Sequence, residues 1–289
     1  RRDSWLALLV LLDLTVFSFP YLKCSEPANL QISRDAALIL RRFGPQRYAA
    51  SPEIAGLNEN LPMGISSVGG YDPLSSRAFD QFASRYFGYD PGERISSLLE
   101  VDPAPLWRLQ GVSYYLRSTG DLSKLPAGYT ELQSVGEVFR DHYLYQDPRA
   151  FSRAFVVERA EVASDEQTRQ MALRGDPRLS RAVFLSRPAP EDHSGPGGMA
   201  GPVLVTPNEV LVEAMGPGYL VLSDVYTSGW KASVDGQPAA VLEATAGLHR
   251  AVGLTPGPHR VRFSFQPDSL VAGLWISRAA ALVCMLVLG

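Results

Sequence analysis

Residues 230–237 read Trp-Lys-Ala-Ser-Val-Asp-Gly-Gln. Asp235-Gly236 is a strong signal for a two-residue hairpin turn, because such a turn favours a positive φ at both central positions. The run before it, Trp230–Val234, alternates apolar and polar residues, as a half-buried strand does. We therefore predict an antiparallel hairpin here.

The same pattern extends in both directions from this hairpin. After Phe151, short alternating runs are separated by Gly and Pro clusters, which is typical of an antiparallel β-sandwich. Residues 163–178 interrupt the strands with a short predicted helix. The candidate strands are Ala154–Val157, Ala182–Leu185, Val203–Thr206, Glu209–Met215, Tyr219–Tyr226, Trp230–Val234, Ala239–Ala244, His249–Leu254 and Arg260–Gln266. We assign residues 151–268 to a β-sandwich domain.

Residues 27–150 have a more mixed character. Apolar residues at helical spacing predict helices over residues 35–43 and 75–87. The candidate strands are Arg47–Ala50, Val112–Leu116, Tyr129–Val135 and Val138–Tyr145. The expected fold class is therefore α+β, with a mixed α/β domain over residues 27–150 followed by the sandwich, and with a membrane helix on either side.

Both ends of the sequence are apolar over a length that fits a membrane span. Asp13 is the only charged residue of Ser4–Leu22, and Arg278 is the only one of Leu270–Leu288. A helix needs about 20 residues to cross a bilayer. We expect transmembrane helices over residues 4–22 and 269–289, the second truncated, so that the chain is a piece of a polytopic membrane protein.

The charges near these spans suggest an orientation and a pairing. Arg1 and Arg2 place the N-terminal end in the cytoplasm by the positive-inside rule, so residues 23–268 are expected outside. Asp13 and Arg278 each lie near the middle of a span, where charges are costly. They form a candidate intramembrane pair; alternatively, each faces other helices of the larger protein.

Composition and motifs exclude several functional classes. The 289 residues contain 27 Lys and Arg against 30 Asp and Glu, so a basic nucleic-acid surface is not expected. The four histidines have no metal-ligand spacing, and no nucleophile elbow of the G-x-S-x-G type occurs. The sequence therefore predicts no catalytic residue and no metal site in this chain.

Two polar clusters remain as candidate substrate-binding residues. Asn60, Tyr71 and Asp72 lie in a Gly-rich stretch that can line a sugar or phosphate pocket; alternatively, Asp72 caps the helix that starts near Ser75. Tyr226 and Trp230 follow Ser223-Asp224 and can stack on a sugar ring, or they pack in the sheet.

At these residues the chain resembles the YfhO-like family of bacterial polytopic membrane proteins. The features of that family occur here in the same order along nearly the whole chain. They are the span with an internal Asp at 11–14, the segment Asn58–Leu74, the strand Gly111–Leu116, the passage Leu144–Val157, the hairpin Leu222–Gly236 and the strand Pro256–Phe265 leading into an apolar helix.

The resemblance implies a function at the bacterial cytoplasmic membrane. Such proteins look like GT-C-type glycosyltransferases, which transfer a sugar from a polyprenyl-phosphate donor to cell-envelope polymers outside the membrane. Their catalytic carboxylate lies in an earlier loop, so this multi-pass protein's residues 23–268 are expected to be an accessory or acceptor-positioning region. The implied partners are the lipid bilayer, the polyprenyl-linked sugar and a cell-wall polymer acceptor. The resemblance assigns no cofactor to this chain and leaves a divalent metal open.

Two other functional classes remain open from the sequence. The chain can be a non-catalytic carbohydrate-binding or envelope-assembly module of a membrane protein. It can also be a transporter or channel subunit, in which Asp13 and Arg278 line the path.

Overall fold

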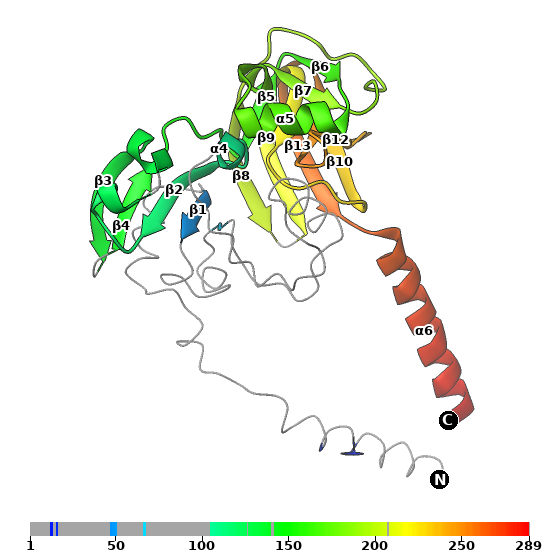
Figure 1. The fold of residues 1–289 in the computed structure, drawn as a ribbon. Coiled ribbons are helices and arrows are strands. Elements are labelled where there is room, and N and C mark those ends of the chain that lie inside the picture. The colour runs from blue at the N-terminus through cyan, green and yellow to red at the C-terminus, as the bar shows by residue number, and fades with distance from the viewer. Residues whose placement is uncertain are drawn as a thin grey trace. The chain divides into compact units, whose positions relative to one another are not determined.

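The computed structural model describes residues 12–13, 16, 47–50, 66–67, 105–125, 127–139, 142–206 and 208–288. The predicted helices over residues 35–43 and 75–87 lie outside these ranges. The chain divides into two compact units, one of which is Gln31–Phe265, while the C-terminal helix belongs to the other. The predicted mixture of α and β structure is confirmed. The unit Gln31–Phe265 contains a four-stranded and a nine-stranded sheet (Figure 1).

The smaller sheet has the strand order β1-β2-β4-β3. Its strands are β1 (Arg47–Ala50), β2 (Val112–Arg117), β3 (Gln133–Phe139) and β4 (His142–Gln146). β1 runs parallel to β2, and the other pairs are antiparallel. The helix α4 (Pro105–Leu109) leads into β2, and the 3-10 turns η3 (Leu122–Lys124) and η4 (Ala127–Glu131) lead into β3.

Tyrosine packing explains one wrong strand prediction in this sheet. The sequence predicts Tyr129 in a strand over 129–135, but this residue lies in η4 and is 1% exposed. Its ring meets those of Tyr115 and Tyr145 edge-on, at centroid distances of 5.8 and 5.6 Å. Burial between two aromatic rings therefore outweighs the preference of tyrosine for strands. The predicted strand 138–145 is likewise divided between β3 and β4.

The larger sheet is organised around two long strands, β9 (Glu209–Leu222) and β13 (His249–Phe265), which pair along most of their length. The sequence predicts each of them as two separate strands. The remaining strands are β5 (Ala154–Val157), β6 (Arg159–Val162), β7 (Ala182–Leu185), β8 (Ala200–Thr206), β10 (Trp230–Val234), β11 (Gln237–Ala239) and β12 (Leu242–Ala244). β10 and β11 form the predicted hairpin around Asp235-Gly236.

The Gly and Pro residues that suggested chain breaks are bends within these paired strands. Pairing of β13 with β9 shifts register between Leu254 and Gly257, opposite Gly216 and Gly218. Gly218 has a φ of +141°, and a Cβ there would collide with the backbone of Val157. Glycine therefore lets β9 bend while it stays hydrogen-bonded on both sides.

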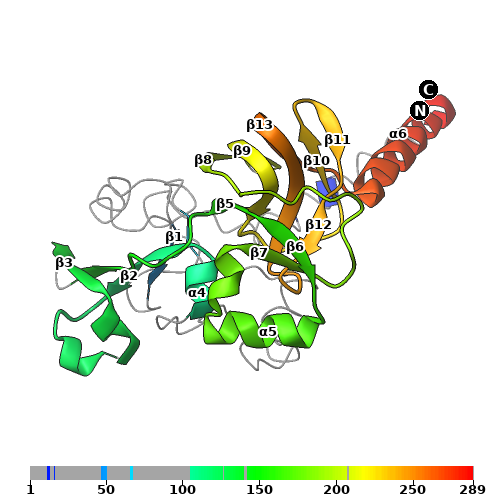
Figure 2. The ribbon, with the colours of Figure 1, turned by 90° about the horizontal axis from the view of Figure 1, so that it is seen from above.

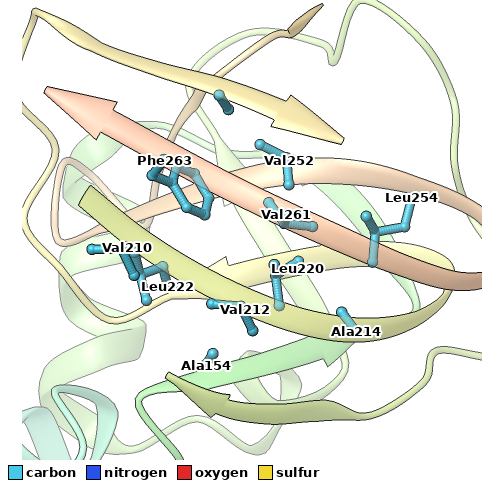
Figure 3. Packing of buried hydrophobic residues seen from close by; sticks show 11 residues of the cluster. Ala154, Val210, Val212, Ala214, Leu220, Leu222, Val252, Leu254, Val261 and Phe263 are labelled. Carbon is cyan, nitrogen blue, oxygen red and sulfur yellow. The ribbon is translucent and has the colours of Figure 1, made fainter. Parts of the chain in front are cut away.

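The bend lets one sheet enclose its own core. β8 and β10 pair with one half of the β9–β13 ribbon, while β5 and β12 pair with the other half. Buried side chains from both halves form a single apolar cluster (Figure 3). Its members include Val212, Leu220, Val252, Leu254 and Phe263, each at most 1% exposed. We call this the sheet core; each such side chain contributes roughly 1.5–3 kcal/mol by leaving water.

One strand pair departs from the predicted antiparallel sandwich. β6 and β7 are parallel and are joined by α5 (Asp165–Arg174), as a crossover connection requires. The predicted helix over 163–178 is confirmed in its central part. Ser164 caps it in a capping box with Gln167, and Gly175 ends it with a φ of +65°. The nine strands form one hydrogen-bonded sheet that folds back on itself, rather than an all-antiparallel sandwich.

α5 and α4 pack together beside this sheet (Figure 2). Leu106 and Leu109 of α4 join Met171 of α5 and Phe184 of β7 in one apolar cluster. The two sheets are therefore connected through buried contacts of these helices.

The helix α6 (Asp268–Leu288) follows β13. Residues 268–285 are long and apolar enough to cross a membrane, and large side chains such as Trp275 and Ile276 are exposed. Of the predicted N-terminal span, only Leu12, Asp13 and Val16 are described, all of them helical and exposed. Two membrane spans therefore stay a prediction.

Candidate functional site

Three arginine side chains surround the carboxylate of Asp224, and we call these four residues the arginine cluster. Asp224 pairs with Arg47, with Arg153 at 3.2 Å and with Arg250 at 2.9 Å. Arg47 is the first residue of β1, whereas the other members belong to the large sheet or its loops. The cluster therefore joins side chains from both sheets.

Strand register places three members of the cluster at one end of the large sheet. Arg250 of β13 is the pairing partner of Leu222, the last residue of β9. On the other side of β9, Ala154 of β5 also pairs with Leu222, so Arg153 lies opposite Ser223. The Ser223 N–H donates to the carbonyl of Arg153 at 2.8 Å, which continues the hydrogen-bond ladder by one residue. Asp224 is the next residue along the chain, just beyond the end of β9, and its carboxylate pairs with both Arg153 and Arg250.

Arg47 reaches this end of the sheet from β1. Its Nη1 donates to the carbonyls of Gln110 and Ser223, and its Nη2 donates to Asp224. The neighbouring His249 ring contacts the Gln110 amide at 3.3 Å and the Thr245 hydroxyl at 3.0 Å. A polar network thus connects the cluster to the contact between the two sheets.

Burial and charge act against each other in the cluster. The side chains of Arg47, Arg153 and Asp224 are 12%, 15% and 11% exposed, and that of Arg250 is 3% exposed. Burial alone would raise the pKa of Asp224, but the three nearby guanidinium groups outweigh it and hold this pKa well below its usual range. Burial lowers the pKa of Arg250 to about 10, so this side chain stays protonated at neutral pH.

Positive charge is in excess at this site. Burial lowers the pKa of His249 to about 4, so its ring is neutral at pH 7 and contributes no charge. Three guanidinium groups face one carboxylate, and the described residues supply no second carboxylate to any of them. A largely buried, uncompensated charge costs several kcal/mol. The arrangement therefore favours an anion from outside the chain.

The Arg250 side chain also has hydrogen-bond donors without a partner. Its Nη2 binds Asp224, but its buried Nε and Nη1 have no hydrogen-bond partner. The guanidinium carbon lies 3.8 Å from the centroid of the Trp230 ring, which covers one face of the group. Guanidinium N–H groups bind phosphate and carboxylate oxygens, and here the two unpaired nitrogens lie on either side of the Nη2 group that binds Asp224.

Of the candidate binding residues, Trp230 and Tyr226 lie in the described structure. Trp230 is half-buried and contacts Phe265, with ring centroids 5.4 Å apart, in addition to Arg250. The Tyr226 N–H donates to the Gly247 carbonyl, and its side chain is half-buried. Asn60, Tyr71 and Asp72 lie outside the described residues. A role in binding sugar stays a prediction for all five.

Arg278 lies on α6, where its guanidinium carbon is 5.8 Å from the Trp275 ring centroid. Within the ranges that the structure describes, no ion pair joins Arg278 to Asp13. Their pairing stays a prediction. The same ranges contain no group of three or more His, Cys, Asp or Glu residues able to hold a metal ion.

Sequence reasoning included Asp224 in a motif but gave the arginines no role. A signal was present in each strand: Arg250 interrupts the apolar run His249–Leu254, and Arg153 directly precedes Ala154–Val157. A charged residue at a buried strand position indicates a partner nearby. The position of Arg47 depends on pairing across more than a hundred residues, and no local pattern shows it.

Comparison with known proteins adds no further assignment. No protein-family model, curated protein or solved structure matches the chain.

Proposed function

We propose that this chain is the extracytoplasmic accessory region of a membrane glycosyltransferase-like protein, and that it holds an anionic group of a substrate at the arginine cluster. The observation that carries the proposal is the surplus of positive charge around Asp224, together with the unused donors of Arg250. Lipid-linked sugars and many envelope polymers carry phosphate or carboxylate groups. Binding such a group would position a substrate without any catalytic residue in this chain.

The apolar ends support attachment to the bacterial cytoplasmic membrane. α6 is long and apolar enough to span a bilayer, and the resemblance to the YfhO-like family includes a span at each end. In this topology, two membrane helices flank an outer region made of a mixed α/β domain and a β-rich domain. The outer region would then meet lipid-linked sugar donors and polymer acceptors at the membrane surface.

Topology is tested by labelling a single cysteine in intact cells. Ser194 is exposed and lies in the β7–β8 connection, so Ser194→Cys in a Cys24→Ser, Cys284→Ser background reports on the outer region. A membrane-impermeant maleimide should label it before lysis. Labelling only after lysis would contradict the proposed orientation.

Function is tested in cells that carry the full-length protein. Arg153→Gln removes one of the three guanidinium groups around Asp224, whereas Arg262→Gln removes an arginine that pairs with Glu209 on the surface of β13. We expect Arg153→Gln to reduce sugar incorporation into envelope polymer about tenfold, because a charge-assisted hydrogen bond contributes about 1.5–3 kcal/mol. Arg262→Gln should leave incorporation unchanged. Equal incorporation in both variants, at equal protein levels, would contradict the proposal.

A non-catalytic carbohydrate-binding or envelope-assembly module is the second candidate. The half-buried Tyr226 and Trp230 favour it, since aromatic rings with an accessible edge or face can contact sugars. Tyr226→Ala is the informative variant, because Trp230 also covers Arg250. Loss of glycan binding in Tyr226→Ala, with unchanged sugar incorporation in Arg153→Gln, would favour this second function.

A further inference from the structure

We infer that the ligand of the arginine cluster is a phosphomonoester dianion, bound while Asp224 stays in place. This inference rests on the proposed function, because it specifies the anion that the same site takes. A polyprenyl phosphate that carries a sugar is a phosphodiester, so the lipid form of this ligand is the phosphomonoester that remains after the sugar has been transferred. It concerns a phosphate group with two negative charges, whether on a lipid headgroup or on a soluble molecule.

The charge balance selects a dianion. Among the residues that the structure describes, three guanidinium groups and one carboxylate leave two positive charges uncompensated. A monoanion, such as a phosphodiester or an acetate, would leave one of them uncompensated in a largely buried site. A phosphomonoester carries about two negative charges above its second pKa of about 6, and it brings the site close to neutrality.

The arrangement of donors also fits a phosphate with three terminal oxygens. Asp224 already accepts from Arg47 Nη2, from Arg153 Nε and Nη2, and from Arg250 Nη2. The buried Nε and Nη1 of Arg250 remain unpaired. Arg153 Nη1 is held only by a long contact of 3.4 Å to the Ser66 hydroxyl. An incoming phosphate can therefore bind the partly exposed Arg153, and it reaches the buried Nε and Nη1 of Arg250 after a side-chain movement that uncovers them.

Replacement of Asp224 by the ligand is a less favourable alternative. Its carboxylate is paired with all three arginines, and moving it away would leave three positive charges for the ligand to compensate. The cluster is partly open to solvent at Arg47, Arg153 and Asp224, so a phosphate can approach without removing this carboxylate.

A matched pair of probes tests the inference directly. Methyl phosphate and dimethyl phosphate differ by one methyl group, but only the first forms a dianion. We expect titration calorimetry on the full chain in a zwitterionic detergent at pH 7.5 to show at least tenfold tighter binding of methyl phosphate. Arg153→Gln removes one of the two surplus positive charges, so the preference for methyl phosphate over dimethyl phosphate should fall several-fold. Arg262→Gln should retain this preference.

The pH dependence separates the charge of the ligand from that of the protein. In the part of the chain that the structure describes, the charged and titratable groups of this network are Asp224, the three arginines and His249. Burial lowers the pKa of His249 to about 4, and the three arginines hold the pKa of Asp224 lower still. These two groups therefore keep their charge state between pH 5.5 and 7.5. Methyl phosphate affinity should rise over this interval, and affinity for sulfate, a dianion throughout, should stay constant.

The results distinguish the inference from the proposed function. If both phosphates bind equally well and Arg153→Gln weakens both equally, the site binds anions but the dianion inference is overturned. If methyl phosphate, dimethyl phosphate and sulfate all bind the wild type no more tightly than Arg153→Gln, the proposed function fails as well. A wild-type chain and an Arg153→Gln variant with similar near-UV circular dichroism exclude misfolding as the cause.

The two possible sources of the phosphate are separated by competition. Phosphatidic acid, a lipid phosphomonoester, is added to the detergent micelles, and phosphatidylglycerol, a phosphodiester with one negative charge, is the control. Competition by phosphatidic acid alone supports the inference and assigns the ligand to the membrane surface, whereas competition by neither lipid, with methyl phosphate still bound, assigns it to a soluble molecule. If phosphatidylglycerol competes equally, the preference for a dianion is overturned.

Discussion

The sheet core and the arginine cluster lie in the same unit of the protein but are built from opposite kinds of side chain. The sheet core contains aliphatic and aromatic residues from the two halves of the bent β9–β13 ribbon. The arginine cluster holds four charged side chains at one end of that ribbon, and their charges do not balance. The first is complete within the chain. For the second, the described residues supply one carboxylate to three arginines, and we propose that a further anion supplies the remaining negative charge.

This difference separates a structural region from a candidate binding region. Apolar packing stabilises the fold without any specific ligand, because the gain comes from leaving water. Surplus buried charge destabilises the folded state until a counter-charge binds, so stability then depends on the ligand. Variants of the two regions should therefore differ most in how they respond to added anions.

The largest expected effect is at the carboxylate of the cluster. Asp224→Asn leaves three arginines without their only described carboxylate, and it should reduce the free energy of unfolding by about 3–5 kcal/mol. Asp235→Asn, which alters an exposed carboxylate paired with His259, is the control and should cost less than about 1 kcal/mol. Urea unfolding followed by near-UV circular dichroism measures both. Equal, small losses would show that the cluster does not contribute to stability.

An apolar deletion in the sheet core should cost nearly as much but respond differently to salt composition. Leu220→Ala removes a fully buried side chain and should cost about 2–5 kcal/mol. Replacing chloride by sulfate at constant ionic strength should leave the difference between this variant and the wild type unchanged. Leu204→Ala, at a side chain that is 66% exposed, is the matched control and should have little effect. A sulfate-dependent loss in Leu220→Ala would remove the distinction between the two regions.

These two regions also differ in how well the sequence predicts them. The alternation of Val261, Phe263 and Phe265, and the Asp235-Gly236 turn, predict the strands and the hairpin because these signals are local. At the bends near Gly216 and Gly257 the sequence predicts strand ends instead, because Gly and Pro are common both in turns and in strand bulges. The arginine cluster depends on strand register and on contact between distant segments, so its geometry has no local signal.

Acid should destabilise the protein through His249, whose ring is 1% exposed beside the cluster. Its pKa is lowered to about 4 by burial, compared with about 6.5 in an unfolded chain. The unfolded state therefore binds the proton first, and the stability present above pH 6.5 is lost as the pH falls toward 4. The loss should reach about 3 kcal/mol, and urea unfolding at several pH values measures it.

The contribution of His249 is isolated by His249→Gln, which cannot titrate. The variant should show a flatter pH dependence than the wild type over this range, whatever its absolute stability. His259 is the control: burial alone would lower its pKa, but the bond to Asp235 contributes to a net rise, so His259→Gln should not flatten the loss below pH 6. Parallel curves for the wild type and His249→Gln would contradict the assignment.

The smallest expected effect is the stabilisation of the wild type by sulfate. Binding to the folded state alone adds about 2.7 kcal/mol at a ligand concentration one hundred times the Kd, and less at lower concentrations. A series of sulfate concentrations at constant ionic strength should raise the Tm of the wild type more than that of Arg153→Gln. Arg262→Gln should follow the wild type. Equal shifts in all three proteins would indicate a general salt effect.

The most direct test of the central claim is to locate an anion in crystals of the full chain. Selenate has the charge and shape of sulfate, and its selenium gives an anomalous signal. The account predicts a selenium peak at the arginine cluster, with selenate oxygens within hydrogen-bond distance of Arg153 and Arg250 and with Asp224 still paired. Selenium peaks at other sites only, with Nε and Nη1 of Arg250 still unpartnered, would contradict it.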